Sequence, residues 1–125
     1  MNPLYIDKTD DSPKVVFDPD KDLFILEGMS MPEETTRFYS VLINWLTNYS
    51  KSPNSFTKFI FKIYYYNSSS SIEFVKILKI LDKINKTDNK VKVIWYYNSL
   101  DETIIEDGEE FKKYFDLEIE LKPLN

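Results

Sequence analysis

Two hydrophobic periodicities alternate along this chain, and their alternation limits the folds that it can adopt. Residues 56–66 and 91–95 are runs rich in β-branched and aromatic side chains, which are typical of strands. Segments around them carry apolar residues at spacings of three and four, which indicates amphipathic helices. Strands that alternate with helices of this length predict right-handed crossovers and a mixed, mostly parallel sheet.

The complete pattern predicts one α/β domain over residues 1–125, with the element order β-β-α-β-α-β-α-β. Its first two strands, near 15–17 and 23–26, form a hairpin around an Asp/Pro-rich turn, and the second stops at Gly28. Both faces of 56–66 are largely apolar or aromatic, so the sheet is expected to be covered on both sides. The last strand, 117–121, alternates like an edge strand with one solvated face. Helices are predicted over three segments: 30–49, 70–86 and 101–115.

Helix starts carry sequence signals of their own. Two residue pairs have the spacing of a capping box: Ser30 with Glu33, and Ser70 with Glu73. Gly108 interrupts the third helical segment, because glycine weakens a helix interior. We expect the indoles of Trp45 and Trp95 to lie in the core.

The composition excludes several kinds of catalytic site. The chain contains no histidine and no cysteine, which rules out disulfides, thiolate nucleophiles, Cys/His zinc sites and Ser-His-Asp triads. It has two glycines and therefore no glycine-rich phosphate loop. No cofactor is predicted, although a carboxylate-only metal site or acid/base pair survives these exclusions.

Charge and hydropathy exclude two classes of partner. The formal net charge is −5, the lysines are scattered, and Arg37 is the only arginine, so nucleic-acid binding is not expected. No apolar run approaches the ~18 residues of a membrane-spanning helix, so no membrane insertion is expected. The N-terminus lacks the basic and apolar regions of a signal peptide, and we expect a cytoplasmic location.

The carboxyl ends of parallel strands are where α/β sheets bind ligands or partners. Three segments meet this edge in the predicted fold: 28–34, 66–71 and 96–102. The serine run 68–71 lies where a strand gives way to a helix. A phosphate on such a hydroxyl meets free backbone N–H groups and the positive helix end. The simpler interpretation is that these serines form only a loop and a helix cap.

Acidic and aromatic residues at the same edge also have two interpretations each. Six carboxylates could hold a metal or act as an acid/base pair, or could only complement a helix dipole: Asp101, Glu102, Glu106, Asp107, Glu109 and Glu110. Tyr66 and Tyr97, at strand ends, fit either an exposed patch for a protein partner or a core with hydroxyl tips reaching water.

Four segments, in order along almost the whole chain, resemble the SiaC-type regulatory phosphoproteins, a bacterial family of about this size. The first is Thr9–Phe17, and the second runs from Glu27 to Glu33 and continues with Phe38-Tyr39 and Trp45-Leu46. The third is Tyr65–Ser70. The fourth is Val93–Tyr97 with Asp101-Glu102 and Glu106–Glu109. The family is similar in architecture to anti-sigma-factor antagonists of the STAS class, which agrees with the predicted element order.

The resemblance implies a phosphorylation switch and no enzyme. It implies a partner kinase, a PP2C-like phosphatase, and an unphosphorylated form that binds and activates a downstream partner, in family members a diguanylate cyclase. The family's acceptor is the threonine of an Asn-Thr-Ser-Ser run, and here Asn67 is followed by Ser68. The candidate acceptors are therefore Ser68, then Ser69, then Ser70, with Ser70 expected as the helix N-cap.

Ten residues in or directly beside the edge segments are the candidate partner-binding residues: Glu27, Gly28, Ser30, Pro32, Glu33, Tyr66, Asn67, Tyr97, Asp101 and Glu102. Two other functions remain open at this point. One is a constitutive protein-binding module in which the serines are only cap and loop. The other is a small carboxylate- or metal-dependent enzyme that uses Asp101 or Glu102.

Overall fold

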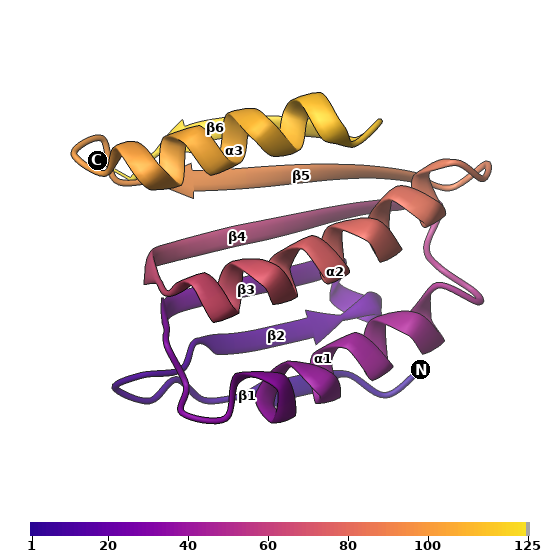
Figure 1. Ribbon diagram of the computed structural model, residues 1–125. Coiled ribbons are helices and arrows are strands. Elements are labelled where there is room, and N and C mark those ends of the chain that lie inside the picture. Colours follow the sequence, from indigo (N-terminus) through magenta and orange to yellow (C-terminus); the bar gives the residue numbers. More distant parts are fainter. Residues whose placement is uncertain (125) are drawn as a thin grey trace.

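Six strands form one sheet in which the spatial order is the order along the chain (Figure 1). The computed structural model describes residues 1–124. Its strands are β1 (Leu4–Ile6), β2 (Lys14–Asp18), β3 (Leu23–Ser30), β4 (Phe56–Tyr66), β5 (Lys90–Tyr97) and β6 (Glu118–Pro123). Its helices are α1 (Thr35–Tyr49), α2 (Ser68–Asn85) and α3 (Glu102–Tyr114), with a short 3-10 turn at Pro19–Lys21. Strands β1 to β3 pair antiparallel, and β3 to β6 pair parallel.

The predicted mixed α/β domain is confirmed, with one additional strand. Strand β1 was missed because three residues are too few to show a periodicity, and it pairs with β2 through Leu4 opposite Phe17. Among residues 1–124, no helix is long and apolar enough to cross a bilayer.

Strand β3 does not stop at Gly28 but continues to Ser30. Gly28 has a φ of +128°, a conformation that side-chain-bearing residues rarely adopt. The pairing register with β4 shifts at this point, so that Tyr64 is an extra residue between two paired positions. Because Ser30 remains paired in the sheet, α1 begins only at Thr35, and the predicted capping box of Ser30 with Glu33 does not form.

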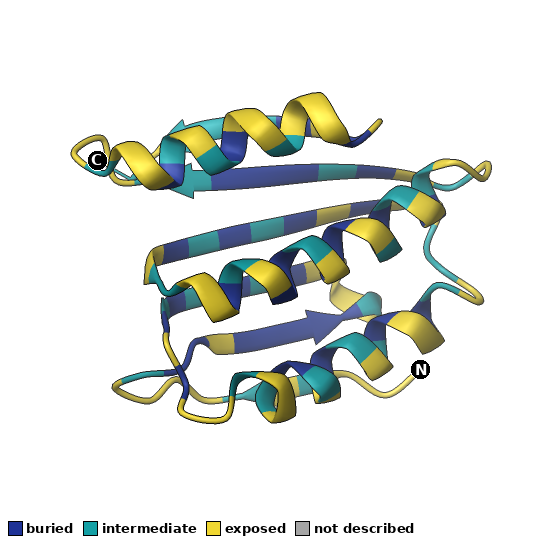
Figure 2. Ribbon diagram, in the orientation of Figure 1, coloured by how far each residue is buried: buried dark blue, intermediate teal, exposed yellow. Residues whose placement is uncertain are grey.

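All three helices lie on one face of the sheet (Figure 1), so the prediction of two covered faces is wrong. Along β4, Thr57, Phe59, Phe61 and Ile63 are buried, whereas the intervening residues are exposed or half-buried (Figure 2). The uncovered face carries one apolar row of residues that pair in register: Val16, Ile25, Ile60 and Ile94. This row is the reason why the sequence pattern indicated a second covered face. Charged side chains flank this row, and their alkyl stems can cover apolar surface.

Aromatic rings fill the core under the helices. Phe61 contacts Phe59, Phe74 and Trp95 with ring centroids 4.9–5.4 Å apart. Trp95 is buried as predicted. Trp45 is only partly buried, because its indole nitrogen donates to the carbonyl of Asn2 at the surface, 2.9 Å away.

Gly108 lies inside an uninterrupted α3, contrary to the predicted break. A Cβ at this position would lie 2.7 Å from Cδ1 and 2.9 Å from Nε1 of Trp95. The Trp95 indole in turn donates to the carbonyl of Ile104 on the same helix, at 3.0 Å. Glycine is therefore required for α3 to approach β5 this closely.

Replacing Gly108 with alanine is expected to destabilise the protein. Overpacking of a filled core costs about 1–3 kcal/mol, and better helix propensity returns roughly 1 kcal/mol. Because Trp95 is held on all sides, we expect a net loss of about 1 kcal/mol in urea unfolding. The neighbouring exposed substitution Glu109→Ala is the control, and equal stability of the two variants would contradict this packing.

Candidate functional site

The carboxyl ends of β3, β4 and β5 meet at one edge of the sheet, where the three predicted segments come together. Ser30 at the end of β3 pairs with Tyr66 at the end of β4. The backbone N–H of Asn67 then donates to the carbonyl of Ser30 at 3.1 Å. Strand pairing thus extends to the residue before α2 and fixes where that helix begins.

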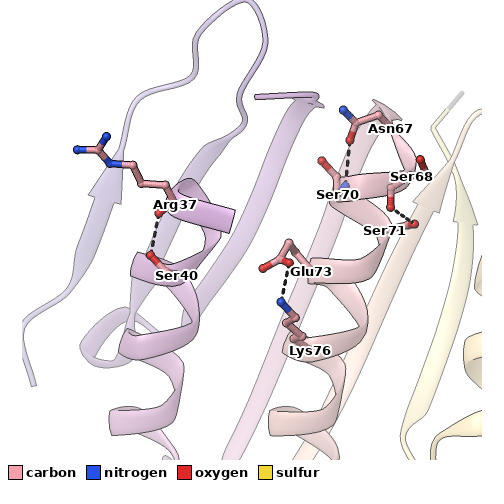
Figure 3. A network of polar contacts seen from close by, with 8 residues as sticks. All are labelled: Arg37, Ser40, Asn67, Ser68, Ser70, Ser71, Glu73 and Lys76. Atoms are coloured by element: carbon pink, nitrogen blue, oxygen red, sulfur yellow. Dashed lines mark hydrogen bonds and ion pairs between the residues drawn. The ribbon is translucent and has the colours of Figure 1, made fainter. Parts of the chain in front are cut away.

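Asn67 caps α2. Its side-chain oxygen accepts a hydrogen bond from the N–H of Ser70 at 2.9 Å (Figure 3). The expectation that Ser70 is the N-cap is therefore wrong, and Ser68 is the first helical residue. The predicted capping box of Ser70 with Glu73 does not form either, because the Glu73 carboxylate pairs with Lys76 at 2.8 Å.

The four serines differ sharply in their surroundings. Ser68 and Ser69 are exposed, and within residues 1–124 their hydroxyls form no side-chain hydrogen bond. Ser71 is half-buried and donates to the carbonyl of Ser68 at 2.7 Å. Ser70 is fully buried. Of the three candidate acceptors, only Ser68 and Ser69 present a hydroxyl to solvent.

Ser70 belongs to a buried chain of hydroxyls. It donates to the carbonyl of Ser30 at 2.8 Å, and the Ser30 hydroxyl donates to Ser70 Oγ at 2.8 Å. Because the single Ser30 proton is used there, the Tyr39 hydroxyl donates to Ser30 Oγ. Burial raises the pKa of Tyr39 well above its ordinary value, so it remains a donor. This chain of Tyr39, Ser30 and Ser70 joins β3, α1 and α2.

A polar groove of about 740 Å³ separates the N-terminal halves of α1 and α2. Ser69 lies on its wall with Arg37 and Ile72. Glu73 and Lys76 line it from α2, and Figure 3 shows these two side chains side by side. The Glu73 side chain is only 4 % exposed. Ser68 is not among the residues that line the groove.

The candidate partner-binding residues do not form one exposed surface. Three of them are buried and position the backbone: Gly28, Ser30 and Pro32. Glu27 lies near Lys62, with 3.9 Å between charged atoms, and accepts from the Tyr64 hydroxyl at 3.3 Å. Glu33 is exposed at the mouth of the groove.

On the α3 side, Tyr66 and Tyr97 are half-buried. The Tyr66 hydroxyl donates to Asp107 at 2.5 Å, and burial together with that carboxylate raises its pKa. Asp101 caps α3 by accepting from the N–H of Ile104 at 3.2 Å, and Glu102 is exposed. Among residues 1–124, no group of three or more acidic side chains is arranged to hold a metal ion. The roles of these residues in partner binding stay predictions.

Sequence reasoning missed Tyr39, which fits a simple apolar stripe on α1. Its hydroxyl could have indicated a polar contact, because a buried tyrosine usually has a hydrogen-bond partner. The partner itself, Ser30, is nine residues away and belongs to a strand.

Comparison with known proteins agrees with this architecture. A family model described as SiaC family regulatory phosphoprotein matches residues 6–124. An uncharacterized protein of Pseudomonas aeruginosa strain UCBPP-PA14 is 24% identical over 113 residues, which is 90% of each chain. Two crystal structures of similar fold are apo-SiaC of P. aeruginosa and the diguanylate cyclase SiaD in complex with its activator SiaC. The first has a TM-score of 0.87 at 21% identity, covering 98% of this chain and 99% of that one. The second has a TM-score of 0.87 at 22% identity, covering 96% and 98%.

The cap of α2 gives a direct test of this geometry. Asn67→Ala removes the acceptor for the Ser70 N–H and is expected to lower the free energy of unfolding by about 1 kcal/mol. Asn67→Asp keeps an acceptor oxygen and favourable charge at the helix start, and should stay close to wild type. Urea unfolding of both variants measures the difference, and equal losses would show that the side chain does not cap the helix.

Proposed function

Because the chain belongs to the SiaC family of regulatory phosphoproteins, we propose that it is a non-enzymatic bacterial adaptor switched by phosphorylation of Ser68. The unphosphorylated form binds and regulates a downstream protein such as a diguanylate cyclase. A cognate Ser/Thr kinase adds the phosphate and a PP2C-like phosphatase removes it. The protein acts in the cytoplasm, where the kinase has access to ATP. The observation that carries the proposal is the exposed hydroxyl of Ser68 at the first position of a capped helix.

Charge favours Ser68 over Ser69 as the acceptor. Ser69 is four residues before Glu73, so a phosphate on Ser69 would share a helix face with a carboxylate. The residue four positions after Ser68 is Ile72, which carries no charge. Ser70 would have to leave the buried hydroxyl chain before a kinase could reach it.

A phosphate at Ser68 changes the surface without disturbing the fold. It adds roughly −1.5 to −2 charge at pH 7, and the positive end of α2 stabilises it there. Burying the same phosphate against a partner requires its removal from water, which is costly for a charged group without a matching cation. The modified protein therefore remains folded, whereas its interface with the partner is weakened.

Intact-mass spectrometry tests the acceptor. After incubation with the cognate kinase and ATP, the wild-type protein should gain the mass of one phosphoryl group. Ser68→Ala should gain none, because it lacks the acceptor hydroxyl. Ser69→Ala is the matched control and should be modified like wild type.

Two results would contradict the proposal. If the wild-type protein gains no phosphate, the protein is a constitutive binding module in which the serines serve only as cap and loop. If Ser68→Ala is modified and Ser69→Ala is not, the charge argument that excludes Ser69 is wrong.

A further inference from the structure

Four lysines follow one another along the exposed side of α2 and its C-terminal cap: Lys76, Lys79, Lys83 and Lys86. Their spacings of three, four and three residues place them on one helix face. The same line continues toward the N-terminus through Ile72, which is 59% exposed, to Ser68. We call these four lysines the lysine stripe.

The carboxylates of α2 offset the charge of only two of the four lysines in the stripe. Glu73 and Asp82 are the acidic residues of the helix, and their side chains are 4% and 15% exposed. Glu73 pairs with Lys76 at 2.8 Å, and Asp82 pairs with Lys86 at 3.2 Å. Within residues 1–124, neither Lys79 nor Lys83 has a carboxylate oxygen within 4.0 Å. A positive strip thus lies on a chain whose net charge is −5.

The two neighbouring helices differ in charge. Helix α2 lies between α1 and α3 (Figure 1). Arg37 is the only charged residue within α1, and it pairs with Glu34 at 3.1 Å. Helix α3 is acidic over most of its length, and Glu110 lies with Val75 in the groove between α2 and α3. Glu33 and Glu34 precede α1 and line the same groove as Ile72 and Lys76. An acidic molecule is therefore attracted to the exposed side of α2 and repelled both by α3 and by Glu33, which leaves α2 itself as the main contact surface.

We propose that the lysine stripe is the docking surface for an acidic surface of the downstream protein partner, with Ile72 as an apolar anchor. This inference rests on the proposed function and deepens it by stating the chemistry of the partner. Dipole complementarity explains lysines in the last turn of a helix, but it does not explain Lys76 and Lys79 in the middle of α2. Nucleic acid and anionic membranes fit less well, because both would extend their phosphates over the acidic α3.

The position of Ser68 connects the stripe to the switch. Lys76 is eight positions after Ser68, which is about 12 Å along the helix axis. This exceeds the Debye length of about 8 Å at physiological ionic strength, so a phosphate at Ser68 does not offset the positive charge that Lys79 and Lys83 present to a partner. It instead presents negative charge to the acidic partner at the N-terminal end of the same surface. The lysines therefore attract an acidic partner to this interface, whereas the phosphate repels it.

Calorimetric titration with the diguanylate cyclase encoded in the same genome tests this inference. Lys79→Glu/Lys83→Glu should weaken binding of the unphosphorylated protein about tenfold, because two attractions become repulsions. Lys79→Gln/Lys83→Gln should weaken it less, about threefold, and should reduce the salt dependence of the affinity. The glutamine variant is the milder change and is less prone to unfold the protein. Thermal unfolding of both variants checks that they are folded.

A matched control changes the same net charge elsewhere. Lys58 and Lys90 are exposed and alternate with buried residues of β4 and β5, so they lie on the uncovered face of the sheet. Lys58→Glu/Lys90→Glu should bind the cyclase like wild type. If this control weakens binding as much as Lys79→Glu/Lys83→Glu, net charge and not the stripe controls affinity, and the inference is overturned.

The outcomes separate this inference from the proposed function. If the wild-type protein does not bind the cyclase, or binds it equally with and without phosphate, the proposed function fails and the docking surface fails with it. If binding is lost on phosphorylation but is unchanged in both Lys79/Lys83 variants, the function stands and the stripe is overturned. A second result would also overturn the inference. The wild-type protein would cosediment with phosphatidylserine vesicles, and the Lys79/Lys83 variants would lose this property but still bind the cyclase. The stripe would then be a membrane-binding surface.

Discussion

The buried hydroxyl chain of Tyr39, Ser30 and Ser70 is the interaction on which the geometry of this edge depends. Each member belongs to a different element, α1, β3 or α2, and all three are fully buried. A buried hydroxyl that loses its partner costs about 1–3 kcal/mol. Because every proton of the chain has an acceptor, the three elements hold one another in place, and the first turn of α2 cannot shift without breaking the chain.

This constraint divides a uniform run of four serines into different roles. Ser70 is locked in the core and Asn67 holds the start of the helix, so Ser68 and Ser69 between them must face solvent. Glu73 then distinguishes these two, because it shares a helix face with Ser69. On the same helix, Ile72 and the lysine stripe follow Ser68 along one exposed face. A modification at the head of α2 can therefore act on whatever binds along it, with no change in the fold.

Hydrophobic periodicity was enough to predict the mixed sheet and the three helices. The alternation of strands and helices then predicted that three strand ends meet at one edge. Periodicity failed where a residue's position depends on contacts with distant parts of the chain. Val16, Ile25, Ile60 and Ile94 have the pattern of residues under a helix, yet they lie on the uncovered face. Asn67 and Ser70 are both suitable N-cap residues by type. Asn67 takes this role because β4 pairs with β3 as far as Ser30, so that α2 begins directly after Asn67.

In the proposed switch, a phosphate at Ser68 controls partner binding on a surface that is otherwise unchanged. The most direct measurement is the affinity of the diguanylate cyclase for protein carrying phosphoserine at position 68 alone, compared with unphosphorylated protein by calorimetry. We expect the modified protein to keep its thermal unfolding midpoint and to bind at least about tenfold more weakly. Equal affinity of the two forms, or a loss of affinity that accompanies unfolding of α2, would contradict it.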